Sequence, residues 1–140
     1  MKTKLIYLTL LISIQLSYSQ IEPEWVIRYS SPFGRGTALG VVVDNTGSVY
    51  ITGYIINQGG DSDFITIKYS SDGIEQWVQT YNGPANGADF AIAIAIDDYS
   101  NVYVTGSSKG IGSDEDYATI KYNTDGVQQW VRRYNERYRQ

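Results

Sequence analysis

The sequence predicts an all-β protein built from four-stranded antiparallel repeat units. Two observations carry this prediction. Short runs rich in Val, Ile, Tyr and Thr alternate with turns rich in Gly and Asp, which is typical of strands. The same order of runs and turns also occurs twice along the 140 residues, and no helical periodicity follows residue 19.

The repeat is visible at single positions. Trp25, Trp77 and Trp130 lie 52 and 53 residues apart, and a Tyr follows each Trp by four residues. Residues 49–53 (VYITG) match residues 102–106 (VYVTG). We take the shared positions as structural anchors of the repeat: Trp25, Trp77, Trp130, Tyr29, Tyr81, Tyr134, Asp44, Asp97, Gly53, Gly106, Gly73 and Gly126.

The second unit shows the four strands in order. Residues 91–96 (AIAIAI) are apolar on both faces, so this run is expected to be buried on both sides. Residues 101–106 form the next run, and Asp98-Tyr99-Ser100 between them reads as a hairpin turn. A loop over 107–115, a third run over 116–122 and a Thr-Asp-Gly turn at 124–126 follow. The last run, 127–134, carries Gln and Arg and is therefore expected outermost.

Such units, packed face to face around an axis, make the blades of a β-propeller. The prediction is two complete blades plus one leading strand, because Trp25 to Tyr29 matches only the fourth run. The expected organisation is a signal peptide at 1–19, a leading outer strand and linker at 20–35, repeat units at 36–88 and 89–135, and a divergent basic tail at 136–140.

Three phrases of the second unit resemble the bacterial β-propeller repeat called SBBP. They are residues 97–106 (DDYSNVYVTG), 116–122 (DYATIKY) and 125–131 (DGVQQWV), and the Asn82-Gly83-Pro84 turn also fits. The resemblance covers nearly all of residues 25–135. It implies a propeller-type repeat of secreted or cell-surface bacterial proteins, without a catalytic motif. The Asn-Gly-Pro turn is missing from the first unit and after Tyr134.

Propellers have about 4–8 blades, so two units do not close a ring. The neighbouring blades come either from a longer chain, of which this sequence is a piece, or from oligomerisation. We expect the first.

The N-terminus predicts export. Lys2 and Lys4 precede an apolar run over 5–16, and small residues at 17–19 suit cleavage after Ser19. The alternative, an uncleaved anchor, is disfavoured because the run is shorter than the ~20 residues that span a bilayer. No later segment is long and apolar enough to span. The expected location is the periplasm, the cell surface or the medium.

Composition excludes several kinds of chemistry. There is no Cys and no His, so disulfides, thiol nucleophiles, imidazole bases and His-ligated metals are absent. Loss of Lys2 and Lys4 with the signal takes the net charge from −4 to −6, and an acidic body disfavours nucleic acid as a partner. We expect no cofactor and no catalytic residues.

Three groups of residues nevertheless need weighing as sites. The loops holding Asp61, Asp63, Asp114 and Asp116 offer hard oxygen ligands of the kind calcium takes, but solvated turn residues are the preferred reading. Asp44 and Asp97 are expected to bond turn amides rather than to catalyse. Tyr54 and Tyr99 at loop edges are candidates for stacking on sugars, and the Trp residues are expected to pack between sheets rather than to form a ligand platform.

The predicted function is an exported, non-catalytic binding or interaction scaffold, with an unknown protein or glycan ligand. A lectin-like subunit that closes a ring by oligomerising is the first alternative. A fragment of a propeller enzyme, a glycosidase or a quinoprotein, is the second. The adjacent Asp97 and Asp98 do not support a glycosidase by themselves, because neighbours on a strand point to opposite faces.

Overall fold

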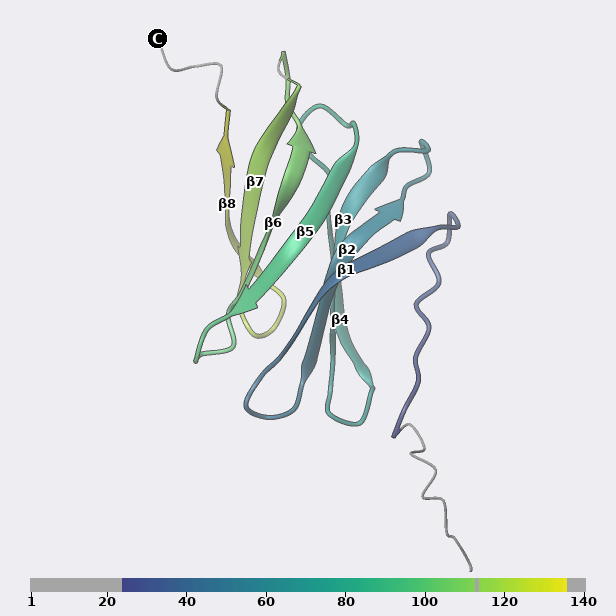
Figure 1. Ribbon diagram of the computed structural model, residues 1–140, viewed down its shortest axis with the longest axis vertical. Coiled ribbons are helices and arrows are strands. Elements are labelled where there is room, and N and C mark those ends of the chain that lie inside the picture. The colour runs from purple at the N-terminus through teal and green to yellow at the C-terminus, as the bar shows by residue number, and fades with distance from the viewer. Residues whose placement is uncertain (1–23, 113, 136–140) are drawn as a thin grey trace, which may run out of the picture.

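The computed structural model describes residues 24–112 and 114–135, and these form two four-stranded antiparallel sheets without helices (Figure 1). The first sheet has the order β1-β2-β3-β4 and the second β5-β6-β7-β8. Each sheet is therefore a meander in which chain neighbours pair. This confirms the all-β, propeller-type fold class, although the described residues do not close a ring. The predicted signal peptide at 1–19 and the basic tail at 136–140 lie outside the described residues.

The strands of the two sheets correspond one to one. In the first sheet they are β1 (Gly36–Val43), β2 (Val49–Ile56), β3 (Ser62–Tyr69) and β4 (Glu75–Tyr81). In the second they are β5 (Asp89–Ile96), β6 (Val102–Lys109), β7 (Glu115–Tyr122) and β8 (Gln128–Tyr134). The expected loop over 107–115 is too long, since β6 continues through Lys109 and pairs it with Glu115.

The sheets pack face to face, and β5 lies against β1, β2 and β3 of the first sheet (Figure 1). The main core sits between them. Its first-sheet members are Tyr50 and Phe64, with Trp77 and Tyr81 partly buried beside them. The second sheet contributes one ring, Tyr122, and otherwise small and branched residues: Ala91, Val102, Val104, Ala118 and Ile120. Large rings on one face therefore fill the space over small residues on the other.

Both first strands contain a β-bulge, between Ala38 and Gly40 and between Ala91 and Ala93. The bulged residues Leu39 and Ile92 are 48% and 56% exposed. The expectation that residues 91–96 are buried on both faces is therefore wrong. β5 is an edge strand, so one of its sides has no neighbour in the sheet, and the bulge turns Ile92 outward.

The leading segment, residues 24–30, is not a strand in the structure, which corrects the prediction for Trp25 to Tyr29. It runs along the side of the first sheet that faces away from the second sheet (Figure 1). A strand needs a hydrogen-bonding neighbour, and no described strand lies beside this segment to supply one. Within the described residues, no helix is long and apolar enough to cross a bilayer.

Candidate functional site

The junction between the two sheets is organised by Trp77. Its indole Nε1 donates to the Thr124 carbonyl oxygen at 3.0 Å, and its ring centroid lies 6.1 Å from that of Tyr122. Gly126 lies beneath the ring with φ of +81°, and a Cβ there would come within 2.7 Å of the indole. Glycine is therefore required both for the turn and for the close approach of the ring. Trp77 is a packing anchor, as predicted.

Trp25 repeats this arrangement on the far side of the first sheet. Its Nε1 donates to the Ser71 carbonyl oxygen at 2.9 Å, its ring lies 6.4 Å from Tyr69, and it covers Gly73. Each of these partners lies 53 positions before the corresponding partner of Trp77. The leading segment therefore occupies the place of a neighbouring fourth strand, although it pairs with no described strand.

Within residues 24–112 and 114–135, the ring contacts of Trp130 are with residues of its own sheet. Its ring lies 6.1 Å from Tyr103, and the Arg132 guanidinium lies 6.0 Å above it. Trp77 has the equivalent contact with Tyr50, at 6.0 Å, in addition to its docking onto the second sheet. The three predicted Trp anchors thus differ in what they hold.

The repeated tyrosines divide in the same way. Tyr81 packs edge-on against Phe64 at 5.5 Å, and its hydroxyl oxygen accepts from Arg133 at 2.9 Å. Tyr134 stacks on Tyr117 at 6.5 Å and is 48% exposed, and Tyr29 is 40% exposed. Of the three repeated tyrosines, Tyr81 at the interface between the sheets is the most enclosed, and it is partly buried.

Asp44 and Asp97 bond the amides of their turns, as predicted. The Asp44 Oδ1 accepts from the amides of Thr46 and Ser48, each at 2.9 Å. Burial acts to raise the pKa of Asp44, but hydrogen bonds from Thr46, Ser48 and the Tyr50 hydroxyl outweigh it and lower the pKa from 3.8 to about 2.

Asp97 is bonded in the same manner, with its Oδ1 accepting from Tyr99 at 3.0 Å and from Asn101 at 2.9 Å. The Asn101 side chain, together with these amides and the Tyr103 hydroxyl, lowers the pKa of Asp97. Both aspartates are turn residues held in the charged form.

The repeated Thr-Gly pair also has a structural role. A Cβ at Gly53 would overlap the Thr37 carbonyl oxygen, because the bulge in β1 brings that backbone close. Gly106 meets Phe90 in the same way. The hydroxyl of Thr52 donates to the Ile65 carbonyl oxygen at 2.9 Å and ties β2 to β3.

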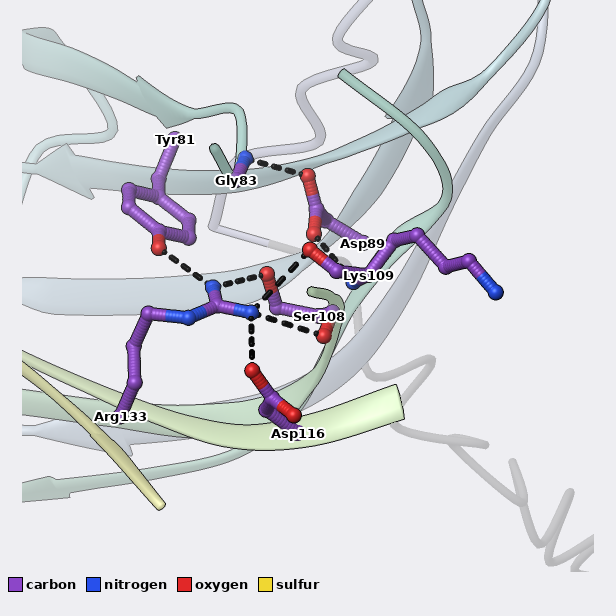
Figure 2. Close-up of polar contacts among 7 residues, drawn as sticks. All are labelled: Tyr81, Gly83, Asp89, Ser108, Lys109, Asp116 and Arg133. Atoms are coloured by element: carbon purple, nitrogen blue, oxygen red, sulfur yellow. Dashed lines mark hydrogen bonds and ion pairs between the residues drawn. The ribbon is translucent and has the colours of Figure 1, made fainter. Parts of the chain in front are cut away.

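A polar cluster that the sequence did not predict lies at one end of the second sheet (Figure 2). Arg133 of β8 reaches across its sheet, and its Nη2 lies 2.9 Å from the Asp116 carboxylate. The same guanidinium donates to the hydroxyl and carbonyl oxygens of Ser108, to the Lys109 carbonyl oxygen and to the Tyr81 hydroxyl. Arg133 thus joins three strands of its own sheet to the first sheet.

Asp89 completes this cluster from the start of β5 (Figure 2). The buried carboxylate accepts from the amide of Gly83 at 2.6 Å and from the amide of Lys109 at 3.1 Å. Burial lowers the pKa of Arg133, but hydrogen bonds with Asp116 and Tyr81 outweigh this and raise it. The cluster therefore fixes both the sheet and the connection between the two units.

The four candidate calcium ligands are dispersed in different settings. Asp61 is exposed, whereas Asp63 is buried and accepts from Asn57 Nδ2 at 3.0 Å. Asp114 lies 3.8 Å from the Lys109 ammonium, and Asp116 is paired with Arg133. Across residues 24–112 and 114–135, no three Asp or Glu side chains gather as a metal site would need.

The two tyrosines considered for sugar stacking are placed differently. Tyr54 lies inside β2 and packs edge-on against Phe90 at 5.0 Å, so its expected position at a loop edge is wrong. Tyr99 lies in the β5–β6 turn and is 84% exposed. Of these two tyrosines, Tyr99 is the one whose ring is accessible for stacking.

A cavity of about 270 Å³ lies on the far face of the first sheet, beside the leading segment. Trp25, Ile27 and Tyr29 form one wall, and Ile51, Ile65, Ile67 and Tyr69 lie on the sheet side. This face corresponds, 53 residues earlier, to the face of the second sheet that forms the core between the sheets. The leading segment covers it only in part.

Two four-stranded meanders joined through the docking of Trp77 define the class of this protein as a propeller-type repeat protein. Comparison with known families identifies the repeat: the model of the SBBP beta-propeller repeat matches residues 76–112. The matched residues run from β4 to the loop after β6 and include the docking Trp77. No curated protein matches the chain.

The sequence did not predict the Arg133 cluster, although one signal was present. Arg133 stands where the first unit has Thr80, and Ser108 stands where it has Ile55. A search for positions at which the two units differ together in polarity would have found this pair.

Proposed function

We propose that this chain is an exported, non-catalytic scaffold whose propeller-type blades present loops and turns to a binding partner. One observation carries the proposal. The residues that the two units share are the residues that hold the sheets, such as Trp77 in its docking site and Asp44 in its turn. Two residues that are exposed and apolar in the turns of the second sheet, by contrast, have polar counterparts in the first unit.

Tyr99 and Ile111 are the two clearest cases. They are 84% and 72% exposed, and the first unit has Thr46 and Gln58 at the matching positions. The two units share their packing residues and differ in their exposed loops. This arrangement suits a scaffold whose loops carry the binding specificity. The partner in this proposal is a protein at the cell surface or outside the cell.

Export is part of the same proposal and rests on the signal-like residues 1–19. The test expresses the full chain in a bacterial host and measures the intact mass of the protein in each cell fraction. The expected result is a periplasmic or extracellular protein that begins at Gln20. A full-length protein that stays in the cytoplasm would overturn export.

Binding is tested on the exported protein with labelled bacterial envelopes as the probe. Tyr99→Ala and Ile111→Ala should each lower binding at least threefold without changing the thermal unfolding midpoint. Val127→Ala is the matched control, because Val127 is 56% exposed in a different turn. Equal binding by all three variants would contradict the loop assignment.

A glycan ligand is the second candidate, and the exposed ring of Tyr99 is the observation that favours it. A glycan array probed with the same protein distinguishes the two. Glycan binding that is lost in Tyr99→Ala would support the glycan-binding function. Hydrolysis of the glycan would instead support the enzyme alternative.

A further inference from the structure

The chain contains one complete sheet-to-sheet junction and both of the faces needed to build another. In the junction, Tyr50, Phe64 and Trp77 of the first sheet meet Val104, Ile120 and Tyr122 of the second. The repeat register assigns the same two kinds of face to the outer sides of the pair of sheets.

The outer side of the second sheet corresponds to the ring-bearing face. It presents Tyr103, Tyr117 and Trp130 where the junction has Tyr50, Phe64 and Trp77. Phe64 is 1% exposed, but Tyr117 is 70% exposed. Tyr103 and Trp130 are partly buried, so this aromatic face is open to solvent chiefly at Tyr117.

The outer side of the first sheet corresponds to the receiving face. Ile51, Ile67 and Tyr69 stand where the junction has Val104, Ile120 and Tyr122. Part of this face is covered by Trp25 and Ile27, and the rest borders the 270 Å³ cavity.

We propose that a second copy of this chain docks head to tail on the first, with the aromatic face of its second sheet against the receiving face of the first sheet. In this contact Trp130 of the incoming copy takes the Ser71 carbonyl and the surface over Gly73. The interface is heterologous, so repeated docking produces a closed ring or an open filament. A ring of about 4–8 blades needs about two to four copies.

The leading segment acts as an internal competitor in this assembly. Trp25 already donates to Ser71 and lies within 2.9 Å of where a Gly73 Cβ would be, so two indoles cannot share the site. A tethered competitor has a high effective concentration, and the apparent affinity for the second copy falls by the fraction of molecules in which the site is open. Removing the Trp25 ring should therefore promote assembly.

The first experiment measures mass against concentration for the exported protein by light scattering after size exclusion. Trp25→Ala should assemble at concentrations at least about tenfold lower than the wild type. Tyr117→Glu in the Trp25→Ala background should return the protein to monomer, because it puts a charge on the aromatic face. Tyr99→Glu is the matched control and should assemble like its parent, since Tyr99 lies in a turn and is 84% exposed.

The second experiment tests the register of the contact. Within the chain, the Lys68 ammonium lies 3.2 Å from the Thr124 carbonyl oxygen. The equivalent pair across two copies is Lys121 and Ser71. The chain has no Cys, so Lys121→Cys with Ser71→Cys in the Trp25→Ala background should yield covalent dimers and higher species with a short bis-maleimide. Each single-Cys variant, and the pair combined with Tyr117→Glu, should give none of the higher species.

Should Trp25→Ala fail to fold by circular dichroism, Ile27→Ser loosens the same segment, because Ile27 is 42% exposed on the same face. A folded Trp25→Ala or Ile27→Ser protein that stays monomeric, or that assembles equally well with Tyr117→Glu, overturns the proposal. The face would then serve blades of a longer chain or another protein. Such a result leaves the scaffold proposal intact, because export and loop binding are measured separately.

Discussion

The equivalent faces of the two sheets differ in solvent exposure. Thr52 and Phe64 of the first sheet are 0% and 1% exposed, whereas Tyr117, which matches Phe64, is 70% exposed and Thr105, which matches Thr52, is only partly buried. The backbone and the strand register are alike in both sheets. Burial in this architecture is therefore set by the neighbouring sheet and not by the position of a residue within its own.

The polar ends of the two sheets differ in a second way. In the second sheet the buried Asp116 is paired with Arg133. In the first sheet the matching Asp63 has an amide partner, Asn57, and burial raises its pKa, with further contributions from Asp89 and Asp61. The fourth strand has Arg133 in the second sheet and Thr80 at the matching position of the first. This one difference decides whether the buried carboxylate has a cationic partner.

The largest expected effect separates two equivalent tryptophans. Trp77→Ala removes the ring that docks one sheet onto the other and should lower the free energy of unfolding by about 3 kcal/mol. Trp130→Ala should cost less than about 1 kcal/mol, because neither described sheet packs its face onto that ring as the second sheet does on Trp77. Urea unfolding below the concentration of any assembly measures both, and equal costs would contradict the comparison.

The next effect concerns the polar cluster. Arg133→Ala leaves buried Asp116 without its cation and should cost about 2 kcal/mol. Arg132→Ala is the matched control and should change stability by less than about 0.5 kcal/mol, because Arg132 is exposed. Both values come from thermal or urea unfolding at pH 7, and an equal loss in the two variants would remove the special role of the cluster.

A smaller effect should appear in acid. The pKa of Asp44 is lowered to about 2, so its charge stabilises the fold above pH 3.8 and this contribution is lost as the pH falls from 3.8 toward 2. Asp44→Ala should cost about 1 kcal/mol at pH 7 and should show a shallower loss of stability over that range. Asn45→Ala, in the same turn, should retain the wild-type pH profile.

The smallest effect would make the first sheet resemble the second. Thr80→Arg places a cation on the strand position from which Arg133 reaches Asp116, and it should stabilise the protein by about 0.5 kcal/mol at pH 7. The raised pKa of Asp63 means that the folded state binds its proton more tightly, so Asp63 makes stability fall as the pH rises above 3.8. Thr80→Arg should flatten that fall. Gln79→Arg, one position away on the opposite face, should leave it unchanged.

Much of the fold was predictable because the repeat makes each signal occur twice. Turn chemistry at Asp97 and Gly126 and the β-branched runs between them located the strands of each sheet, and the structure confirms their order. The packing role of Trp77 followed from its fixed place in the repeat, and the amide bonding of Asp44 followed from its place before a hairpin turn. These features depend on local geometry, which nearby residues determine.

Tertiary structure decided the rest. Residues 91–96 are apolar on both faces, yet Ile92 is 56% exposed, because a bulge on an edge strand turned it outward. Trp25 has the docking partners expected from the repeat, but its segment pairs with no described strand, so the predicted strand was wrong. Arg133 looks like one of several arginines in a basic ending, and only the folded chain brings it to Asp116, Ser108 and Tyr81. The local sequence determines where strands and turns form and which side chains each strand carries. Burial and charge pairing depend on which residues, distant in sequence, pack against that strand in the folded protein.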